Sequence, residues 1–155
     1  MRIGVVGSRR RNSKADKAIV YGELDRFVAE GGAVIVSGGC KTGADKFARE
    51  YALDNGLELV EHLPDLTGVR GRSDAIGRYY ARNAALVADC DILVAIVAEN
   101  RRGGTENALS HAYKRSIPVH IWEVDASIAI LGKKRMTKKT TKTHGGNVCQ
   151  SRLFA

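Results

Sequence analysis

The fold of this chain is decided by the stretch Ala33-Val34-Ile35-Val36-Ser37-Gly38-Gly39-Cys40-Lys41-Thr42-Gly43-Ala44-Asp45. Its first four residues form a short apolar run, which predicts a buried strand. Three glycines follow, and residues 44–52 then place apolar side chains at helical spacing. A glycine-rich turn between a strand and a helix presents backbone N–H groups that can bind an anion. The stretch therefore predicts an α/β unit with a phosphate-binding turn.

Strands and helices are predicted to alternate on both sides of this stretch. The apolar runs that indicate strands cover residues 3–6, 33–36, 57–63, 91–97 and 117–121. Between them, apolar residues recur three and four positions apart, as in amphipathic helices. Ser13 and Asp16 resemble a capping box, and Ser73 is the expected cap of the third helix. The order predicts a Rossmann-like, doubly wound α/β fold: a mostly parallel sheet of about five or more strands with helices on both faces.

Composition excludes several classes of protein. The 155 residues are 44% hydrophobic and 27% charged, as in a single globular domain. Apolar runs are too short for a transmembrane helix, and no signal peptide is recognised, so we expect a cytoplasmic location and no membrane partner. Three widely spaced cysteines and four scattered histidines indicate neither disulfides nor zinc. No metal and no cofactor are therefore predicted.

Four polar motifs are expected at the carboxyl ends of the predicted strands or on a helix beside one. They are Gly7-Ser8-Arg9, Ser37-Gly38-Gly39 with Gly43-Ala44-Asp45, Arg82-Asn83, and Gly103-Gly104-Thr105-Glu106. A parallel sheet binds its ligands at this edge, where the strand order reverses. Small residues let a phosphate approach the backbone, and arginine offers it two parallel donors. The motifs predict a site for a phosphorylated or nucleotide-like ligand.

Each motif residue has an expected role, and some have a structural alternative. The residues expected to shape the phosphate and sugar site are Gly7, Ser8, Gly38, Gly39, Gly43 and Gly104. Arg9 and Arg82 would supply positive charge, while Asp45, Thr105 and Glu106 would orient the sugar or the base. Asp45 and Glu106 also lie in first helical turns, where a carboxylate stabilises the helix dipole, and Thr105 can instead cap its helix. Arg82 can instead form a surface salt bridge, and Cys40 is interpreted as a packing residue.

The net charge of +8 is concentrated at one end of the chain. Residues 1–131 hold 18 Lys and Arg against 17 Asp and Glu, whereas residues 132–155 hold 7 against none. We therefore predict a nearly neutral nucleotide-binding domain over residues 1–131 and a basic, flexible tail over residues 132–155. The tail can contact nucleic-acid phosphates without sequence specificity, or it can simply improve solubility.

In this order the four motifs resemble those of the SLOG superfamily, a Rossmann-like group that includes YpsA-related proteins, the DNA-processing protein DprA and the LOG phosphoribohydrolases. The resemblance runs from about residue 3 to residue 119. It is greatest to the small, stand-alone YpsA-related proteins of phages and bacteria. The resemblance implies a pocket for a nucleotide-derived ligand built by the four loops, and a homo-oligomer that pairs through helices.

Three functions remain open on this basis. The first is binding of a nucleotide-derived phosphorylated ligand, in a sensing, sequestering or regulatory role. The second is LOG-like hydrolysis of the N-glycosidic bond of a nucleoside monophosphate, with Glu106 and Arg82 as catalytic residues. LOG enzymes carry Pro-Gly-Gly-x-Gly-Thr-x-x-Glu, whereas here Glu106 follows Thr105 directly and no proline precedes the glycines. The third is DprA-like binding of single-stranded nucleic acid.

Overall fold

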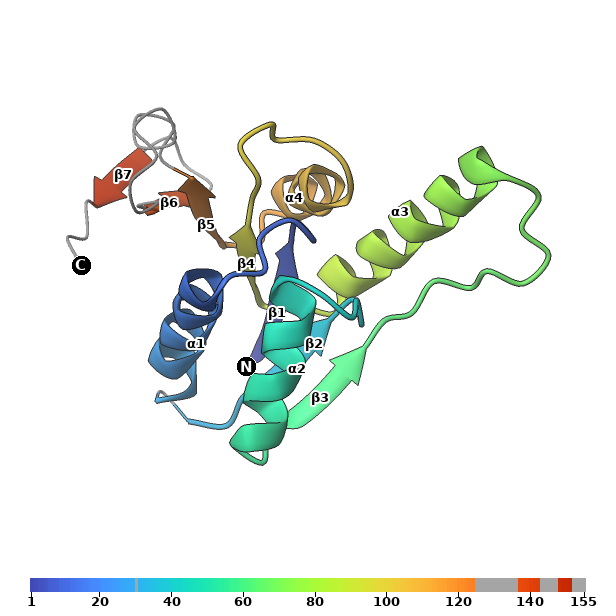
Figure 1. Cartoon of the computed structure of the whole chain (residues 1–155). Helices are drawn as coiled ribbons and strands as arrows, with labels where there is room; N and C mark the ends of the chain where they lie inside the picture. Colours follow the sequence, from blue (N-terminus) through green and yellow to red (C-terminus); the bar gives the residue numbers. More distant parts are fainter. Residues whose placement is uncertain (30, 125–136, 143–147, 152–155) are drawn as a thin grey trace.

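The computed structural model describes residues 1–29, 31–124, 137–142 and 148–151 (Figure 1). Its elements, in chain order, are β1 (Arg2–Gly7), α1 (Lys14–Val28), β2 (Val34–Ser37), α2 (Ala44–Asp54), β3 (Glu58–Glu61), α3 (Arg72–Ala88), β4 (Ile92–Ile96), α4 (Gly104–Lys114), β5 (Val119–Val124), β6 (Thr137–Lys142) and β7 (Val148–Ser151). Each strand predicted from an apolar run is present as one of the first five strands.

The strands form one sheet in the order β3-β2-β1-β4-β5-β6-β7. The first five strands along the chain are parallel to one another. The chain runs outward from β1 through β2 to β3, and then returns to place β4 on the other side of β1. The order of strands therefore reverses between β1 and β4, at the centre of the sheet. This arrangement confirms the predicted Rossmann-like, mostly parallel fold.

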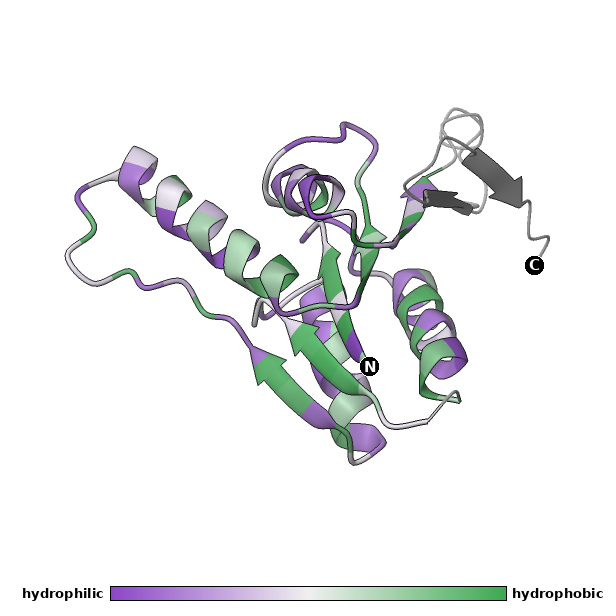
Figure 2. Ribbon diagram, turned by 180° about the vertical axis from the view of Figure 1, so that it is seen from behind, coloured by the Kyte–Doolittle hydropathy of each residue, from purple (hydrophilic) through white to green (hydrophobic). Residues whose placement is uncertain are grey.

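Two hydrophobic layers hold the helices against the sheet. Alternate residues of β4 face opposite ways: Val94 packs in the layer covered by α1 and α2, and Leu93 in the layer covered by α3 and α4. All five residues of β4 are buried, as expected for a central strand with helices on both faces. Figure 2 shows the hydrophobic residues concentrated on the central strands. Fully burying a leucine or valine side chain contributes about 1.5–3 kcal/mol, so this core fixes the sheet that positions the loops.

The first helix begins as the sequence predicts, and the third does not. Ser13 caps α1 through the backbone N–H of Asp16, whose carboxylate accepts in return from the Ser13 N–H. Helix α3 begins at Arg72, with Gly71 as its N-cap, so the prediction that Ser73 caps it is wrong. Gly71 has a φ of 104°, a conformation that side chains disfavour, and this glycine turns the chain into the helix before Ser73 is reached.

Part of the predicted tail is regular structure. Residues 137–142 form β6, which pairs antiparallel with β5, and residues 148–151 form β7, which pairs antiparallel with β6. These two strands lie within the predicted basic tail, whose flexibility stays a prediction. Three of the six residues of β6 are threonines, which favour strands, and the edge of β5 offers unpaired backbone groups. The other tail residues lie outside the described residues, and a domain boundary at residue 131 stays a prediction.

Candidate functional site

The loop after β1 crosses the carboxyl end of β4. The Ser8 backbone N–H donates to the Ile96 carbonyl at 2.9 Å, and the Arg10 guanidinium donates to the Asn100 side chain at 2.5 Å. This places Gly7 and Ser8 where the strand order reverses, as the sequence predicts. Arg9 is exposed beside them, so its cation is open to solvent.

Two glycines let this first loop pack directly on the start of α2. A Cβ atom on Gly7 would lie 2.6 Å from the Ala44 Cβ, and one on Gly43 would lie 2.9 Å from the Ser8 carbonyl oxygen. Gly43 also has a φ of 74°, and its N–H donates to the Asn12 side chain at 2.9 Å. Asn12 is a contact that the sequence analysis missed, although it lies in the predicted loop. The first two motifs are therefore adjacent.

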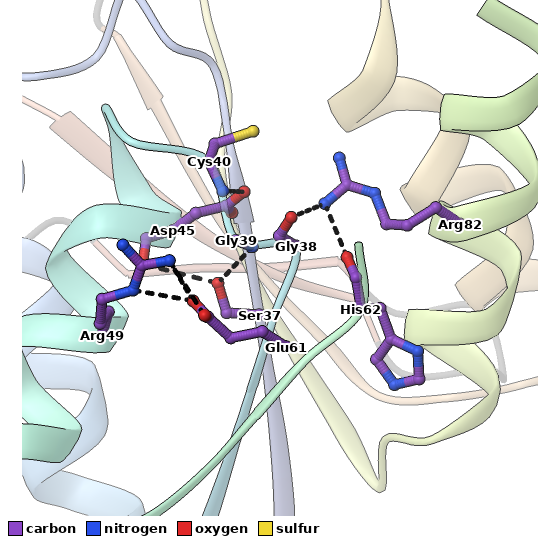
Figure 3. A network of polar contacts seen from close by, with 9 residues as sticks. All are labelled: Ser37, Gly38, Gly39, Cys40, Asp45, Arg49, Glu61, His62 and Arg82. Carbon is purple, nitrogen blue, oxygen red and sulfur yellow. Dashed lines mark hydrogen bonds and ion pairs between the residues drawn. The ribbon is translucent and has the colours of Figure 1, made fainter. Parts of the chain in front are cut away.

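The turn after β2 is closed by its own side chains (Figure 3). The Gly39 N–H donates to the Ser37 hydroxyl at 3.2 Å, and the Cys40 N–H donates to an Asp45 carboxylate oxygen at 3.2 Å. Asp45 is buried, and this burial raises the pKa of its carboxyl. Burial likewise raises the pKa of the Cys40 thiol, which disfavours a nucleophilic thiolate. The Asp45 carboxylate thus binds the backbone of this turn.

Arg82 reaches from α3 to this turn. Its Nη1 donates to the Gly38 carbonyl and, at 3.4 Å, to the His62 carbonyl (Figure 3). A Cβ atom on Gly38 would lie 1.7 Å from that Nη1, so the glycine leaves the space that the guanidinium fills. The Arg82 Nε is buried and has no hydrogen-bond partner among the described residues. Arg82 therefore joins the second and third motifs instead of forming the alternative surface salt bridge.

Asn83 connects α3 to the fourth motif. Its side-chain amide is buried and donates to the Gly104 carbonyl at 3.0 Å and to the Asn107 side chain at 3.2 Å. Asn83 thus fixes the first turn of α4. Together with the contacts above, it completes a chain of contacts that joins all four motifs across the carboxyl edge of the sheet.

The start of α4 differs from one expectation. Its N-cap is Gly103, with a φ of 88°, so the alternative in which Thr105 caps the helix is wrong. The positive φ suits glycine and places the cap two residues before Thr105. Thr105 is partly exposed in the first turn. Within the described residues, α2 and α4 both begin at a glycine without a side-chain cap, which leaves first-turn N–H groups for an anion.

Glu106 is held by an arginine that sequence reasoning missed. Arg101 donates from Nε and Nη2 to the two Glu106 carboxylate oxygens, and from Nη1 to Glu123. Arg101 lies two residues before the fourth motif in the sequence, and that proximity was the available signal. The carboxylate expected to orient a sugar or act as an acid or base is thus engaged in an ion pair.

Arg11 has a structural place below the first loop. It is 3% exposed, its Nε contacts Asp16 at 2.5 Å, and its Nη1 donates to the Val97 carbonyl at 2.8 Å. Its Nη2 has no hydrogen-bond partner in the part of the chain that the structure describes. The Arg11 guanidinium is therefore buried beneath the loop and is not open to solvent, unlike that of the exposed Arg9.

The described residues contain neither a metal-binding cluster nor a membrane-spanning helix. Within residues 1–29, 31–124, 137–142 and 148–151, no group of three or more His, Cys, Asp and Glu side chains could hold a metal ion. No helix in these ranges is long and apolar enough to cross a membrane.

Fold and loops together define a Rossmann-like domain with glycine-rich turns at its ligand-binding edge. The model of the YspA, cpYpsA-related SLOG family (YAcAr) matches residues 1–68 of the chain. This match confirms the predicted resemblance to the SLOG superfamily over residues 1–68, which hold the first two motifs. No curated protein matches the chain.

Two solved structures show the same fold. One is the DNA processing protein A of Helicobacter pylori, described for its single-stranded DNA binding mode, with a TM-score of 0.60 and 23% identity over 78% of this chain. The chain spans 64% of the length of that structure. The other is the molybdenum cofactor carrier protein of Chlamydomonas reinhardtii, with a TM-score of 0.55 and 25% identity over 77% of this chain and 74% of the other.

Proposed function

We propose that this chain binds a nucleotide or nucleotide-derived phosphorylated ligand at the carboxyl edge of its sheet, in a sensing, sequestering or regulatory role. One observation carries the proposal: the four polar motifs are joined by direct contacts. Gly43 packs on the Ser8 backbone, Arg82 contacts Gly38, and Asn83 contacts Gly104. Sequence segments as far apart as residues 7–9 and 103–106 thus share one edge, at the strand reversal where α/β sheets bind their ligands.

The chemistry of this edge suits a phosphate. The glycine caps of α2 and α4 let an anion approach the first-turn N–H groups at the positive ends of two helices. Arg82 adds a fixed guanidinium whose Nε is unused by the described residues. A phosphate at such a site receives charge-assisted hydrogen bonds, which are roughly twice as strong as neutral ones.

A thermal-shift screen tests the proposal. The panel contains nucleoside monophosphates, nucleotide sugars and cyclic nucleotides, alongside mass spectrometry of small molecules released from the denatured protein. A ligand at a hundred times its dissociation constant stabilises the fold by about 2.7 kcal/mol. We expect Arg82→Ala to abolish the shift and Arg78→Ala to retain it, because Arg78 lies one turn away and pairs with Asp74. If the full panel leaves the wild-type protein unshifted, the proposal fails.

Hydrolysis of a nucleoside monophosphate is the less favoured alternative. Glu106, its expected carboxylate, is bound by Arg101 on both oxygens, so it would have to leave this ion pair before it could act on a ligand. Release of free base by the wild-type protein, lost in Glu106→Gln with binding retained, would establish hydrolysis.

Binding of single-stranded nucleic acid rests on the likeness to DNA processing protein A and on the basic residues after position 131. It predicts affinity that falls steeply with salt and disappears when residues 132–155 are deleted. If binding still weakens steeply with salt after this deletion, the interaction lies instead on residues 1–131. A cytoplasmic location stays a prediction from the sequence.

A further inference from the structure

An exposed aromatic ring lies beside the arginine of the candidate site. Tyr79 is on α3, one helical turn before Arg82, and its side chain is 37% exposed. The Arg82 guanidinium carbon lies 5.9 Å from the centre of the Tyr79 ring. Arg82 also contacts the Gly38 carbonyl, so this arginine connects the ring to the turn after β2.

Tyr79 lies on the face of α3 that carries Arg82 and Asn83. Residues three and four apart lie on one face of a helix, so Tyr79, Arg82 and Asn83 share a face. Asn83 contacts Gly104 and Arg82 contacts Gly38, which identifies this face as the one toward the loops. The first half of α3 extends beyond the sheet (Figure 1), and in Arg72–Ala88 the buried residues are Asn83, Leu86 and Val87.

The spacing between the cation and the ring suits one nucleotide. A helical turn rises about 5.4 Å. This rise is comparable to the distance between the phosphate group and the base of a single nucleotide. Tyrosine offers a flat apolar surface on which any base can stack, and a neighbouring arginine adds a favourable cation–π contact. Phosphates meet the glycine turns, so the base would extend along α3.

We propose that Tyr79 is the base-stacking residue of the site, which makes the ligand one with an aromatic base instead of a simple sugar phosphate. The inference rests on the proposed function and deepens it. It assigns an orientation to the ligand, with the phosphate at the start of α2 and α4 and the base at Tyr79.

Titration calorimetry with defined probes tests this assignment. The probes are AMP, GMP, CMP and UMP, with ribose 5-phosphate as the analogue that lacks a base. We expect Tyr79→Ala to weaken the affinity for the tightest-binding nucleotide about tenfold, as loss of one stacked base does. The affinity for ribose 5-phosphate should stay unchanged. Tyr79→Phe keeps the ring and retains affinity. Tyr80→Ala is the matched control, because Tyr80 is 38% exposed and lies on a neighbouring face of the same helix.

The possible results distinguish failure of the role of Tyr79 from failure of the proposed ligand binding. Nucleotides that bind no tighter than ribose 5-phosphate, or that bind Tyr79→Ala as tightly as wild type, overturn the role of Tyr79. If ribose 5-phosphate still binds in an Arg82-dependent way, the proposed function stands. If none of the five probes binds, both proposals fail. Tyr79→Leu, which keeps apolar bulk without a π face, replaces the alanine variant if that variant does not fold.

Discussion

The glycines of this chain differ in what a side chain would meet. At Gly7 an added Cβ would approach the Ala44 Cβ to 2.6 Å and the Ile96 carbonyl oxygen to 3.0 Å, both fixed by the core. At Gly38 it would meet the end of the flexible Arg82 side chain. At Gly22, within α1, nothing lies within 4 Å. The same substitution therefore has three different physical consequences.

Gly7→Ala is expected to destabilise the fold. Because its new methyl group meets backbone and a buried alanine, neighbouring strands must shift, at a cost of about 1–3 kcal/mol. Gly22→Ala is the matched control, and we expect it to stabilise α1 by about 0.5–1 kcal/mol because alanine is the better helix former. Urea unfolding of both variants measures the difference. A Gly7→Ala protein as stable as wild type would contradict the close packing of β1 on α2.

Gly38→Ala is expected to impair ligand binding more than stability. The methyl group displaces the Arg82 guanidinium from the Gly38 carbonyl, and it leaves the main hydrophobic layers untouched. We expect a loss of free energy of unfolding of about 1 kcal/mol, typical of a single substitution, together with loss of the thermal shift by ligand. Retention of that shift would show that Arg82 does not need its present position.

Asp45 gives the stability a distinctive pH dependence. Burial raises the pKa of its carboxyl above the ordinary value of 3.8, so the folded protein binds this proton more readily than the unfolded chain. Its contribution is fully present below pH 3.8 and is lost as the pH rises through the raised pKa. The free energy of unfolding of wild type, minus that of Asp45→Asn, should therefore increase as the pH falls from 7 toward 4.

Asp65 provides the control of opposite sign. The Thr67 backbone N–H lowers the pKa of this exposed carboxyl, so its contribution is present above the ordinary value and is lost as the pH falls. The difference between wild type and Asp65→Asn should thus decrease with falling pH. Equal slopes for the two variants would contradict the burial of Asp45.

The helices of this chain begin in two different ways. Helix α1 begins with a reciprocal capping box between Ser13 and Asp16, which satisfies its first N–H groups internally. Helices α2, α3 and α4 begin at Gly43, Gly71 and Gly103 without a side-chain cap in the described residues. Of these three helices, α2 and α4 begin within the motifs of the candidate site.

Ser13→Ala tests whether the capping box of α1 contributes to stability and not to ligand binding. Loss of the cap should cost about 1 kcal/mol of stability and leave ligand binding unchanged. Ser73→Ala is the control at the start of α3, where Gly71 is the N-cap, and its effect should stay within about 0.5 kcal/mol. Chemical unfolding of both variants measures the change in the free energy of unfolding. Equal losses of stability in the two variants would contradict the observed caps.

Over the whole molecule, the predictable features are those set by local pattern. The apolar runs predicted all five parallel strands, and the glycine-rich turns predicted which loops would reach the carboxyl edge. The sequence did not reveal the partners of side chains that cross between elements, such as Arg101 with Glu106 and Arg11 with Val97. It also missed β6, because pairing with β5 depends on a distant strand edge and not on local apolar pattern.

The projecting part of α3 and the loop before it present apolar side chains that the described core does not cover. Leu63, Leu66 and Ile76 are 67%, 45% and 41% exposed. This favours the proposed homo-oligomer, since exposed apolar groups are characteristic of interaction surfaces. Light scattering after size exclusion should show an oligomer that Ile76→Glu dissociates. Leu53→Glu, on α2 at 70% exposure, should have no effect; a wild-type monomer at micromolar concentration would refute the proposal.

The central position of β1 has a consequence for synthesis of the chain. Its two neighbours are β2, where Arg2 pairs with Val34, and β4, where Ile3 pairs with Ile92. As the chain leaves the ribosome, β1, β2 and β3 can assemble under α1 and α2 well before β4 has emerged. During that interval one edge of β1 presents unpaired N–H and C=O groups, which invite pairing with other chains. The interval between the emergence of β1 and the emergence of β4 is therefore a period in which this edge is open to misassembly.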